Sequence, residues 1–159
     1  MIVVSVNYRL APEYPLPTAY EDSWDATKWV ASHVHENGPD SWINNHADLG
    51  NVFFGGDSAG ANIAHNMAIR VGLNHVDVLK VKGLIMLHPY FGGKDPIGDE
   101  WMGLDDPLLN PAMDQYISIL QSSRIFVCVA ENDPLRERGL FYKKVMETSG
   151  QVGGREKWS

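Results

Sequence analysis

The stretch "NVFFGGDSAGANIAH" (51–65) constrains the fold most, because it joins a strand to a helix through three glycines. The apolar run at 51–55 predicts a buried strand, and the residues after Ala59 follow the spacing of a helix. A chain that changes from strand to helix within a few residues makes a tight turn, which glycine tolerates best. Ser58 lies in this turn, where its hydroxyl would project from the end of the strand.

Predicted strands and helices alternate along the whole chain. Strands are predicted at four short apolar runs: 2–6, 51–55, 81–88 and 124–130. Helices are predicted at three segments with helical spacing: 20–35, the serine turn to Gly72, and 138–150. Strands that alternate with helices favour an α/β fold, with a mostly parallel sheet and crossover helices.

Several residues predict where these helices begin and end. The order Thr-Ala-Tyr-Glu from Thr18 matches a capping box, in which Glu21 reaches back to the first amides. Gly38 and Pro39 end the first helix, and Gly72 closes the helix that follows the serine.

Composition restricts the function classes. A length of 159 residues suits one domain (1–159), and a net charge of −7 disfavours nucleic acid and anionic membranes as partners. No apolar run is long enough to cross a bilayer and no secretory signal precedes 2–6, so we expect a cytoplasmic protein, with the nucleus as a second location. The single Cys128 predicts a small core residue. One cysteine and scattered histidines, with His33 and His35 expected on a solvated surface, offer no metal site.

The pentapeptide Gly56-Asp57-Ser58-Ala59-Gly60 has the pattern Gly-x-Ser-x-Gly at a strand-to-helix junction. This context predicts a nucleophilic Ser58 with a strained φ of about +60°. A Cβ at Gly56 or Gly60 would then strike the neighbouring helix or strand, and the Ala59 amide would stabilise an oxyanion. The alternative is a glycine-rich turn in which Ser58 only caps the helix.

Asp133 in "VAENDPLRERG" follows the last predicted strand, at the edge where catalytic groups of parallel sheets collect. Such a carboxylate can orient a catalytic histidine, which would place Ser58 and Asp133 at one edge, about 7–8 Å apart with an imidazole between them. Two alternatives remain: Asp133 caps a local Asn-Asp-Pro turn, or Glu131 has the catalytic role.

Five blocks in order carry a resemblance: "VVSVNYRLAPEYPLPTAYED", "GGDSAGANIAH", "HPYFGG", "DDPLLNP" and "VCVAENDPLRERG". Together they resemble the plant carboxylesterase family, the hormone-sensitive-lipase-like branch of the α/β-hydrolase fold. The resemblance implies hydrolysis of small-molecule carboxylic esters by a Ser-Asp-His triad, without a cofactor or an obligate protein partner. It makes Ser58 the nucleophile, Asp133 rather than Glu131 the triad acid, and Ala59 the first oxyanion-hole amide.

The sequence also departs from this family. In the family the histidine follows the acid, whereas all six histidines here precede Asp133: 33, 35, 46, 65, 75 and 88. A His-Gly-Gly-Gly loop is absent before 2–6, and the chain is shorter than the family between Glu100 and Trp101. We therefore expect a partial α/β-hydrolase domain that lacks N-terminal strands and the C-terminal strand with the histidine, and that is inactive as written. The strands 2–6 and 51–55 would either pair directly or leave a gap.

Among the histidines, His65 is expected to point away from Ser58, and His88 is the least implausible substitute base. Three other functions share these motifs. A hormone receptor of the gibberellin-receptor type would keep the serine and the acid without the histidine. A related dehydratase would use the same triad, and a non-catalytic interaction fragment would use none of it.

Overall fold

A computed structural model describes residues 1–34, 38–93, 106–120, 122 and 124–150. The helices and strands follow the order α1 (Thr18–Ala31), α2 (Ser41–His46), β1 (Val52–Asp57), α3 (Ala59–Leu73), β2 (Val81–Leu87), β3 (Ile125–Cys128) and α4 (Arg136–Thr148). Two short 3-10 helices, Pro111–Met113 and Ile117–Ile119, lie between β2 and β3. Across the described residues, no helix has the length and apolar character needed to span a membrane.

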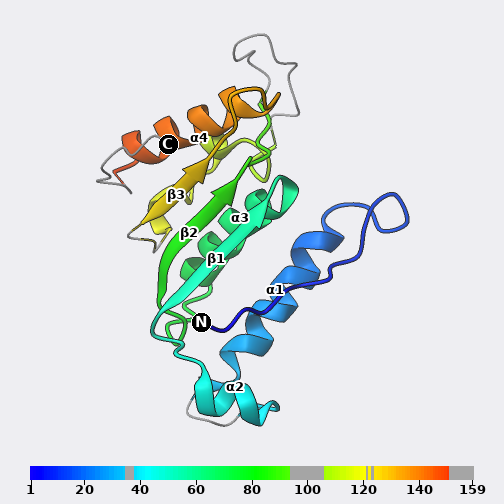
Figure 1. Ribbon diagram of the computed structural model, residues 1–159, viewed down its shortest axis with the longest axis vertical. Helices are drawn as coiled ribbons and strands as arrows, with labels where there is room; N and C mark the ends of the chain where they lie inside the picture. Colours follow the sequence, from blue (N-terminus) through cyan, green and yellow to red (C-terminus); the bar gives the residue numbers. More distant parts are fainter. Residues whose placement is uncertain (35–37, 94–105, 121, 123, 151–159) are drawn as a thin grey trace.

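The sheet has three parallel strands in the order β1-β2-β3 (Figure 1). Asp57 pairs with Leu87, and Leu87 pairs with Cys128, so the three strands end at one edge. The predicted parallel α/β architecture is therefore confirmed, and the ends of each strand differ from the predicted ones by at most two residues. The short α2, which begins on the Asp40 carboxylate cap, was not expected from the sequence.

Helix α3 covers one face of this sheet, and α1 packs on α3 (Figure 1). Most of α3 is buried, and its small side chains at Ala61, Ala64 and Ala68 allow close packing against its neighbours. Arg70 of α3 lies 4.9 Å above the ring of Trp24 in α1, which is itself buried. The apolar face predicted for the first helix therefore meets α3 rather than the sheet.

The capping box predicted at Thr18 does not form. α1 begins at Thr18 itself, with Pro17 in the cap position and no side-chain cap hydrogen bond. Glu21 instead accepts a hydrogen bond of 3.0 Å from Arg70, across the interface between α1 and α3. Glu21 in the first turn of α1 therefore pairs with a residue of another helix and forms no local cap.

Helix α1 ends at Ala31, four residues before the predicted end at 35, because His33 folds back onto it. His33 Nδ1 lies 2.9 Å from the carbonyl of Trp29, and its Nε2 accepts the Asp40 N–H at 3.1 Å. His33 is buried, so the prediction of a solvated surface histidine is wrong there. His35 lies outside the described residues.

Gly72 does not close α3, which continues to Leu73. A Cβ at Gly72 would lie 2.7 Å from Ile119 Cγ2, so this glycine permits close contact with the 3-10 helix Ile117–Ile119. The left-handed residue after the helix is His75, with φ of 51°. The last helix, α4, begins and ends two residues before its predicted bounds of 138–150.

The predicted strand at 2–6 is wrong, since these residues form no strand and join no sheet in the described chain. They run past α1 instead (Figure 1). A strand forms only where a neighbour supplies backbone partners, and none of the described strands pairs with 2–6. Of the two expected outcomes, the structure therefore has the gap rather than direct pairing with β1.

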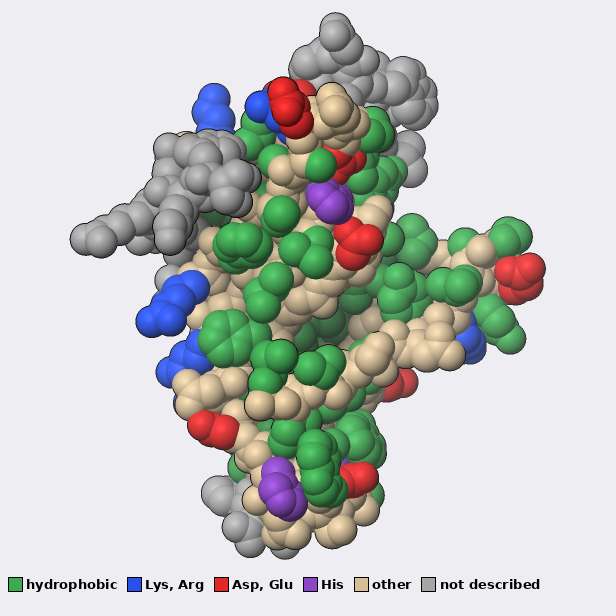
Figure 2. Space-filling view, in the orientation of Figure 1, with side chains coloured by type: hydrophobic (Ala, Val, Ile, Leu, Met, Phe, Trp, Pro, Cys, Tyr) green, Lys and Arg blue, Asp and Glu red, His purple; other side chains and the backbone are tan. Residues whose placement is uncertain are grey.

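The face of the sheet opposite α3 is not covered by any helix in the part of the chain that the structure describes (Figure 1). Figure 2 shows hydrophobic side chains gathered over the strands on this face. Four large apolar side chains of the strands are more than a third exposed: Phe53, Ile85, Leu87 and Phe126. Cys128 is half-buried and forms no disulfide, so the prediction of a core cysteine is only partly met.

Candidate active site

Ser58 lies between β1 and α3 with φ of 53° and ψ of −116°. The expected strained, positive φ is therefore confirmed. The Ser58 N–H donates to the Leu87 carbonyl at 2.9 Å, and its carbonyl accepts the Tyr90 N–H at 3.2 Å. These two bonds fasten the turn to the segment that follows β2. Ser58 is partly exposed at the edge of the sheet.

The Ser58 side chain makes no cap hydrogen bond to α3. A capping serine accepts a hydrogen bond from the amide two or three residues later, which is absent here. The alternative in which Ser58 only caps a glycine-rich turn is therefore wrong. Within the part of the chain that the structure describes, its hydroxyl is not engaged by any other side chain either.

The two glycines of the motif differ from each other. A Cβ at Gly56 would lie 2.2 Å from the carbonyl carbon of Gly60, so only glycine fits there. A Cβ at Gly60 would meet no described atom within 4 Å. The expected clash is confirmed for Gly56 and wrong for Gly60, because it is the backbone of the first helical turn that crowds against Gly56.

Ala59 is the first residue of α3 and is exposed. Its N–H belongs to the first turn, where backbone donors have no acceptor within the helix. The positive end of the helix dipole lies at the same place. The geometry therefore suits an oxyanion donor, as the sequence predicts, although that role stays a prediction.

Asp133 follows β3, and Ser58 follows β1. Because both strands are parallel and end in register, both residues lie at the same edge of the sheet. The shared edge is as predicted, whereas room for an imidazole between the two residues stays a prediction.

The two oxygens of the Asp133 carboxylate have different surroundings. Oδ1 accepts the Leu135 N–H at 2.9 Å, which is the local turn contact considered from the sequence. Oδ2 is buried and has no hydrogen-bond partner among the described residues. Glu131, the competing candidate, is exposed. Asp133 therefore caps a local turn with one oxygen, and its role as a triad acid stays a prediction.

Neither histidine weighed as a substitute base contacts the Ser58 hydroxyl. His65 is fully buried, its Nδ1 lies 3.0 Å from the Tyr142 hydroxyl, and burial lowers its pKa to about 3. His88 has a positive φ of 41°, and its Nδ1 lies 3.4 Å from Asp57 Oδ1. His65 is thus a neutral core residue, and His88 pairs with the acid beside the serine.

A cavity of about 220 Å³ lies beside Ala59. Its walls come from the loop 8–16, the first turn of α1, the start of α3 and the segment after β2. Most of the lining is apolar or aromatic, as in small-molecule sites. A ligand in this cavity would lie next to the expected oxyanion donor.

Comparison with known proteins identifies the scaffold that holds these groups. Residues 1–102 match the model of a family with the alpha/beta hydrolase fold. The chain belongs to the α/β-hydrolase family. This α/β hydrolase therefore has its Gly-x-Ser-x-Gly turn within the matched region.

Plant proteins similar to this α/β hydrolase include probable carboxylesterase 1 of Arabidopsis thaliana, which is 42% identical over 173 residues. That match covers 96% of this chain and 54% of the relative. A 2-hydroxyisoflavanone dehydratase of Glycyrrhiza echinata is 39% identical, with coverage of 96% and 55%. The resemblance to plant carboxylesterases is confirmed, and the chain spans about half the length of the curated relatives it matches.

Solved structures agree on the fold. A Rhizomucor miehei esterase has a TM-score of 0.70 at 24% identity, over 92% of this chain and 50% of that one. A hyperthermophilic esterase from Pyrobaculum calidifontis has a TM-score of 0.67 at 28% identity, with coverage of 90% and 52%. The sheet and helices of this chain therefore match about half of an esterase structure.

Sequence analysis missed two residues that organise this site. The Tyr20 hydroxyl donates to Asn62 Oδ1 at 2.7 Å, and Asn62 Nδ2 donates to the Leu108 carbonyl at 2.9 Å. Asn62 lies one turn after Ser58, and its N–H donates to the Ser58 carbonyl at 3.3 Å. Helical spacing marks Tyr20 as an apolar-face residue, and the sequence alone does not reveal that Asn62 is buried beside it.

Proposed function

We propose that this chain carries the nucleophile region of a carboxylic ester hydrolase in which Ser58 attacks the substrate. One observation carries the proposal: Ser58 has φ of 53°, which a non-glycine residue adopts only where its surroundings impose it. The turn directs the hydroxyl away from helix capping and leaves it for chemistry. The carboxylesterase names among the plant relatives support the same reaction.

Each group near Ser58 has a role in this reaction. The Ser58 oxygen bonds to the ester carbonyl carbon while its proton passes to a base. The carbonyl oxygen becomes an oxyanion, which the Ala59 N–H at the start of α3 stabilises. The bond to the alcohol then breaks as the alcohol takes up the proton, and water hydrolyses the acyl-serine that remains.

The base in this proposal is a histidine that Asp133 orients, and no histidine among the described residues bonds to Asp133 Oδ2. The support is the buried Asp133 Oδ2, which has no partner among the described residues. A buried acceptor left unpaired costs about 1–3 kcal/mol, and an imidazole N–H would satisfy it. We expect no ester turnover unless such a base is supplied, because serine is a weak nucleophile without a base.

The test supplies the base from solution. The purified chain is incubated with para-nitrophenyl acetate, with and without imidazole, beside a Ser58→Ala control. Peptide mass spectrometry then locates any acetyl group. We expect acetyl-Ser58 only with imidazole present, and Asp133→Ala should lower its rate of formation by about tenfold or more.

Two results would contradict the proposal. Acetylation of other residues with none at Ser58, when imidazole is present, would remove Ser58 as the nucleophile. Steady turnover by the unmodified chain without imidazole, abolished by Ser58→Ala, would show that a base such as His88 already lies within reach.

Two related functions would use the same cavity. A hormone receptor of the gibberellin-receptor type would bind a ligand there, and imidazole would not lead to acetyl-Ser58. A dehydratase is favoured by the 39% identity to the Glycyrrhiza echinata enzyme, and it would eliminate water from a hydroxylated substrate. Action on small-molecule esters and a cytoplasmic location likewise remain proposals.

A further inference from the structure

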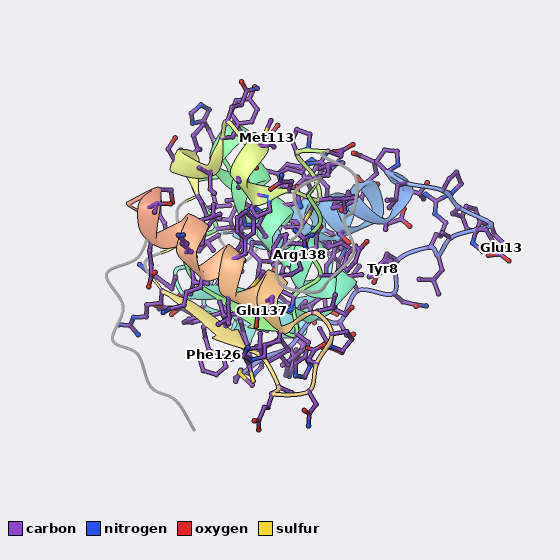
Figure 3. The ribbon with its side chains drawn as sticks, turned by 90° about the horizontal axis from the view of Figure 1, so that it is seen from above. Tyr8, Glu13, Met113, Phe126, Glu137 and Arg138 are labelled. Carbon is purple, nitrogen blue, oxygen red and sulfur yellow. The ribbon has the colours of Figure 1, made fainter. Side chains whose placement is uncertain are left out.

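Four of the six tyrosines of this chain line the cavity beside Ala59. They come from three separate segments: Tyr8 and Tyr14 from the loop, Tyr20 from α1, and Tyr90 from the segment after β2. Figure 3 shows Tyr8 near the base of the projecting loop that carries Glu13 at its tip. Segments distant in sequence thus converge to surround one small space with aromatic rings.

Two of these rings have partners before any ligand arrives. The Tyr20 hydroxyl is bound to Asn62, and Tyr20 is 4% exposed. Arg9 lies 5.0 Å from the centre of the Tyr14 ring and forms an ion pair of 2.7 Å with Asp22 of α1. The Tyr20 wall is therefore preorganised, which lowers the cost of ordering it around a ligand.

The volume of the cavity is enough for an aromatic ring. A cavity of about 150 Å³ lined by apolar side chains binds benzene, so 220 Å³ holds one ring with a few substituent atoms. Aromatic walls favour a flat ring, because offset and edge-to-face pairs gain more than the burial of area alone. A saturated ring or an alkyl chain of the same size gains the burial without these ring pairs.

We infer that the group bound in the cavity beside Ala59 contains an aromatic ring, so that the substrates are esters with an aromatic acyl or alcohol part. The ester reaction in this inference rests on the proposed function, whereas the aromatic ligand rests on the cavity alone. Tyr14 and Tyr90 are the two walls to test, since they are 46% and 39% exposed and their truncation leaves the core intact.

The experiment compares two ketones that cannot be hydrolysed. Acetophenone and cyclohexyl methyl ketone have the same carbon skeleton and differ in aromaticity, and NMR titration gives the affinity of the chain for each. We expect acetophenone to bind about tenfold more tightly, as two or more favourable ring pairs imply. Tyr14→Leu and Tyr90→Leu should each lower that preference by about threefold or more, whereas the corresponding Phe variants keep it.

Tyr116→Leu is the matched control, because Tyr116 is a similarly exposed tyrosine that does not line the cavity. Equal affinity for the two ketones would overturn the inference, and so would an equal loss of preference in Tyr116→Leu. The outcome is separate from that of the esterase proposal. A preference for acetophenone without acetylation of Ser58 would uphold the aromatic site and reject the nucleophile. Acetylation of Ser58 with equal affinity for the two ketones would uphold the nucleophile and reject the aromatic site.

Discussion

The phenol of Tyr20 in α1 donates to the amide oxygen of Asn62 in α3 at 2.7 Å, in the buried interface between the two helices. Because Asn62 lies one turn after Ser58 and also holds the Leu108 carbonyl at 2.9 Å, this bond links a wall of the cavity to the serine turn. Burial raises the pKa of Tyr20 to about 12, so the phenol stays a neutral donor.

Replacing Asn62 should cost more than removing the Tyr20 hydroxyl. Asn62→Ala leaves the buried phenol without an acceptor, and we expect a loss of about 2 kcal/mol or more in the free energy of unfolding. Tyr20→Phe leaves Asn62 Oδ1 still bound to Asn66, at 3.2 Å, and should cost about 1 kcal/mol. Urea unfolding measures both losses. An equal loss in the two variants would contradict the link between cavity wall and serine turn.

The two motif glycines offer a matched pair of substitutions. Gly56→Ala places a Cβ 2.2 Å from the Gly60 backbone, so we expect a loss of about 3 kcal/mol or a failure to fold. Gly60→Ala enters open space in the first turn of α3, and alanine favours a helix by up to about 1 kcal/mol. Thermal unfolding measures the stability of both variants. A destabilised Gly60→Ala would contradict the geometry of the turn.

Acid should destabilise the chain through His65. Its pKa is about 3 in the folded chain against 6.5 ordinarily, so the unfolded chain binds a proton first as the pH falls. The contribution of His65 to stability is complete above about pH 6.5 and decreases toward pH 3, by up to about 1.4 kcal/mol per pH unit. Unfolding free energies across this range should have a shallower pH slope in His65→Gln. The exposed His46→Gln serves as the control, and an unchanged slope in His65→Gln would refute the assignment.

The Arg9 side chain should control the acidity of Asp22. Hydrogen bonds from the Arg9 side chain and backbone lower the pKa of Asp22 to about 2. In Arg9→Gln the pKa measured by NMR should rise toward its ordinary 3.8, while the backbone bond retains part of the effect. Lys80→Gln, at an exposed position, should leave the pKa of Asp22 unchanged. If Arg9→Gln gave the same value as the unmodified chain, the ion pair would not hold the loop in solution.

Local patterns predicted what depends on neighbours in sequence. The apolar runs at 51–55 and 81–88 became β1 and β2, and the glycine spacing around Ser58 gave its positive φ. In both cases the determining contacts lie within a few residues or between consecutive strands of one sheet. The parallel order then placed Ser58 and Asp133 at one edge without any further information.

Features that depend on distant partners could not be predicted in this way. The run at 2–6 has strand character but no neighbour in the described chain to pair with. The sequence predicts a capping role for Glu21. Its actual partner, Arg70, lies 49 positions later and cannot be read from local spacing. The Tyr20 bond to Asn62 spans 42 positions, so the tyrosine-lined cavity exists only once α1 packs on α3. Sequence periodicity predicts which side of a helix is buried, but it does not predict which element packs against that side.

The face of the sheet opposite α3 has a consequence for how this chain behaves during folding. Phe53 of β1 and Phe126 of β3 are exposed on either side of β2, and β1 has a strand partner on one side alone within the described residues. A free strand edge beside apolar side chains is a template on which another chain can add a strand. Folding and aggregation therefore compete for the same surface. The yield of refolded monomer should fall as the protein concentration rises, and a chaperone that shields apolar surface should restore it.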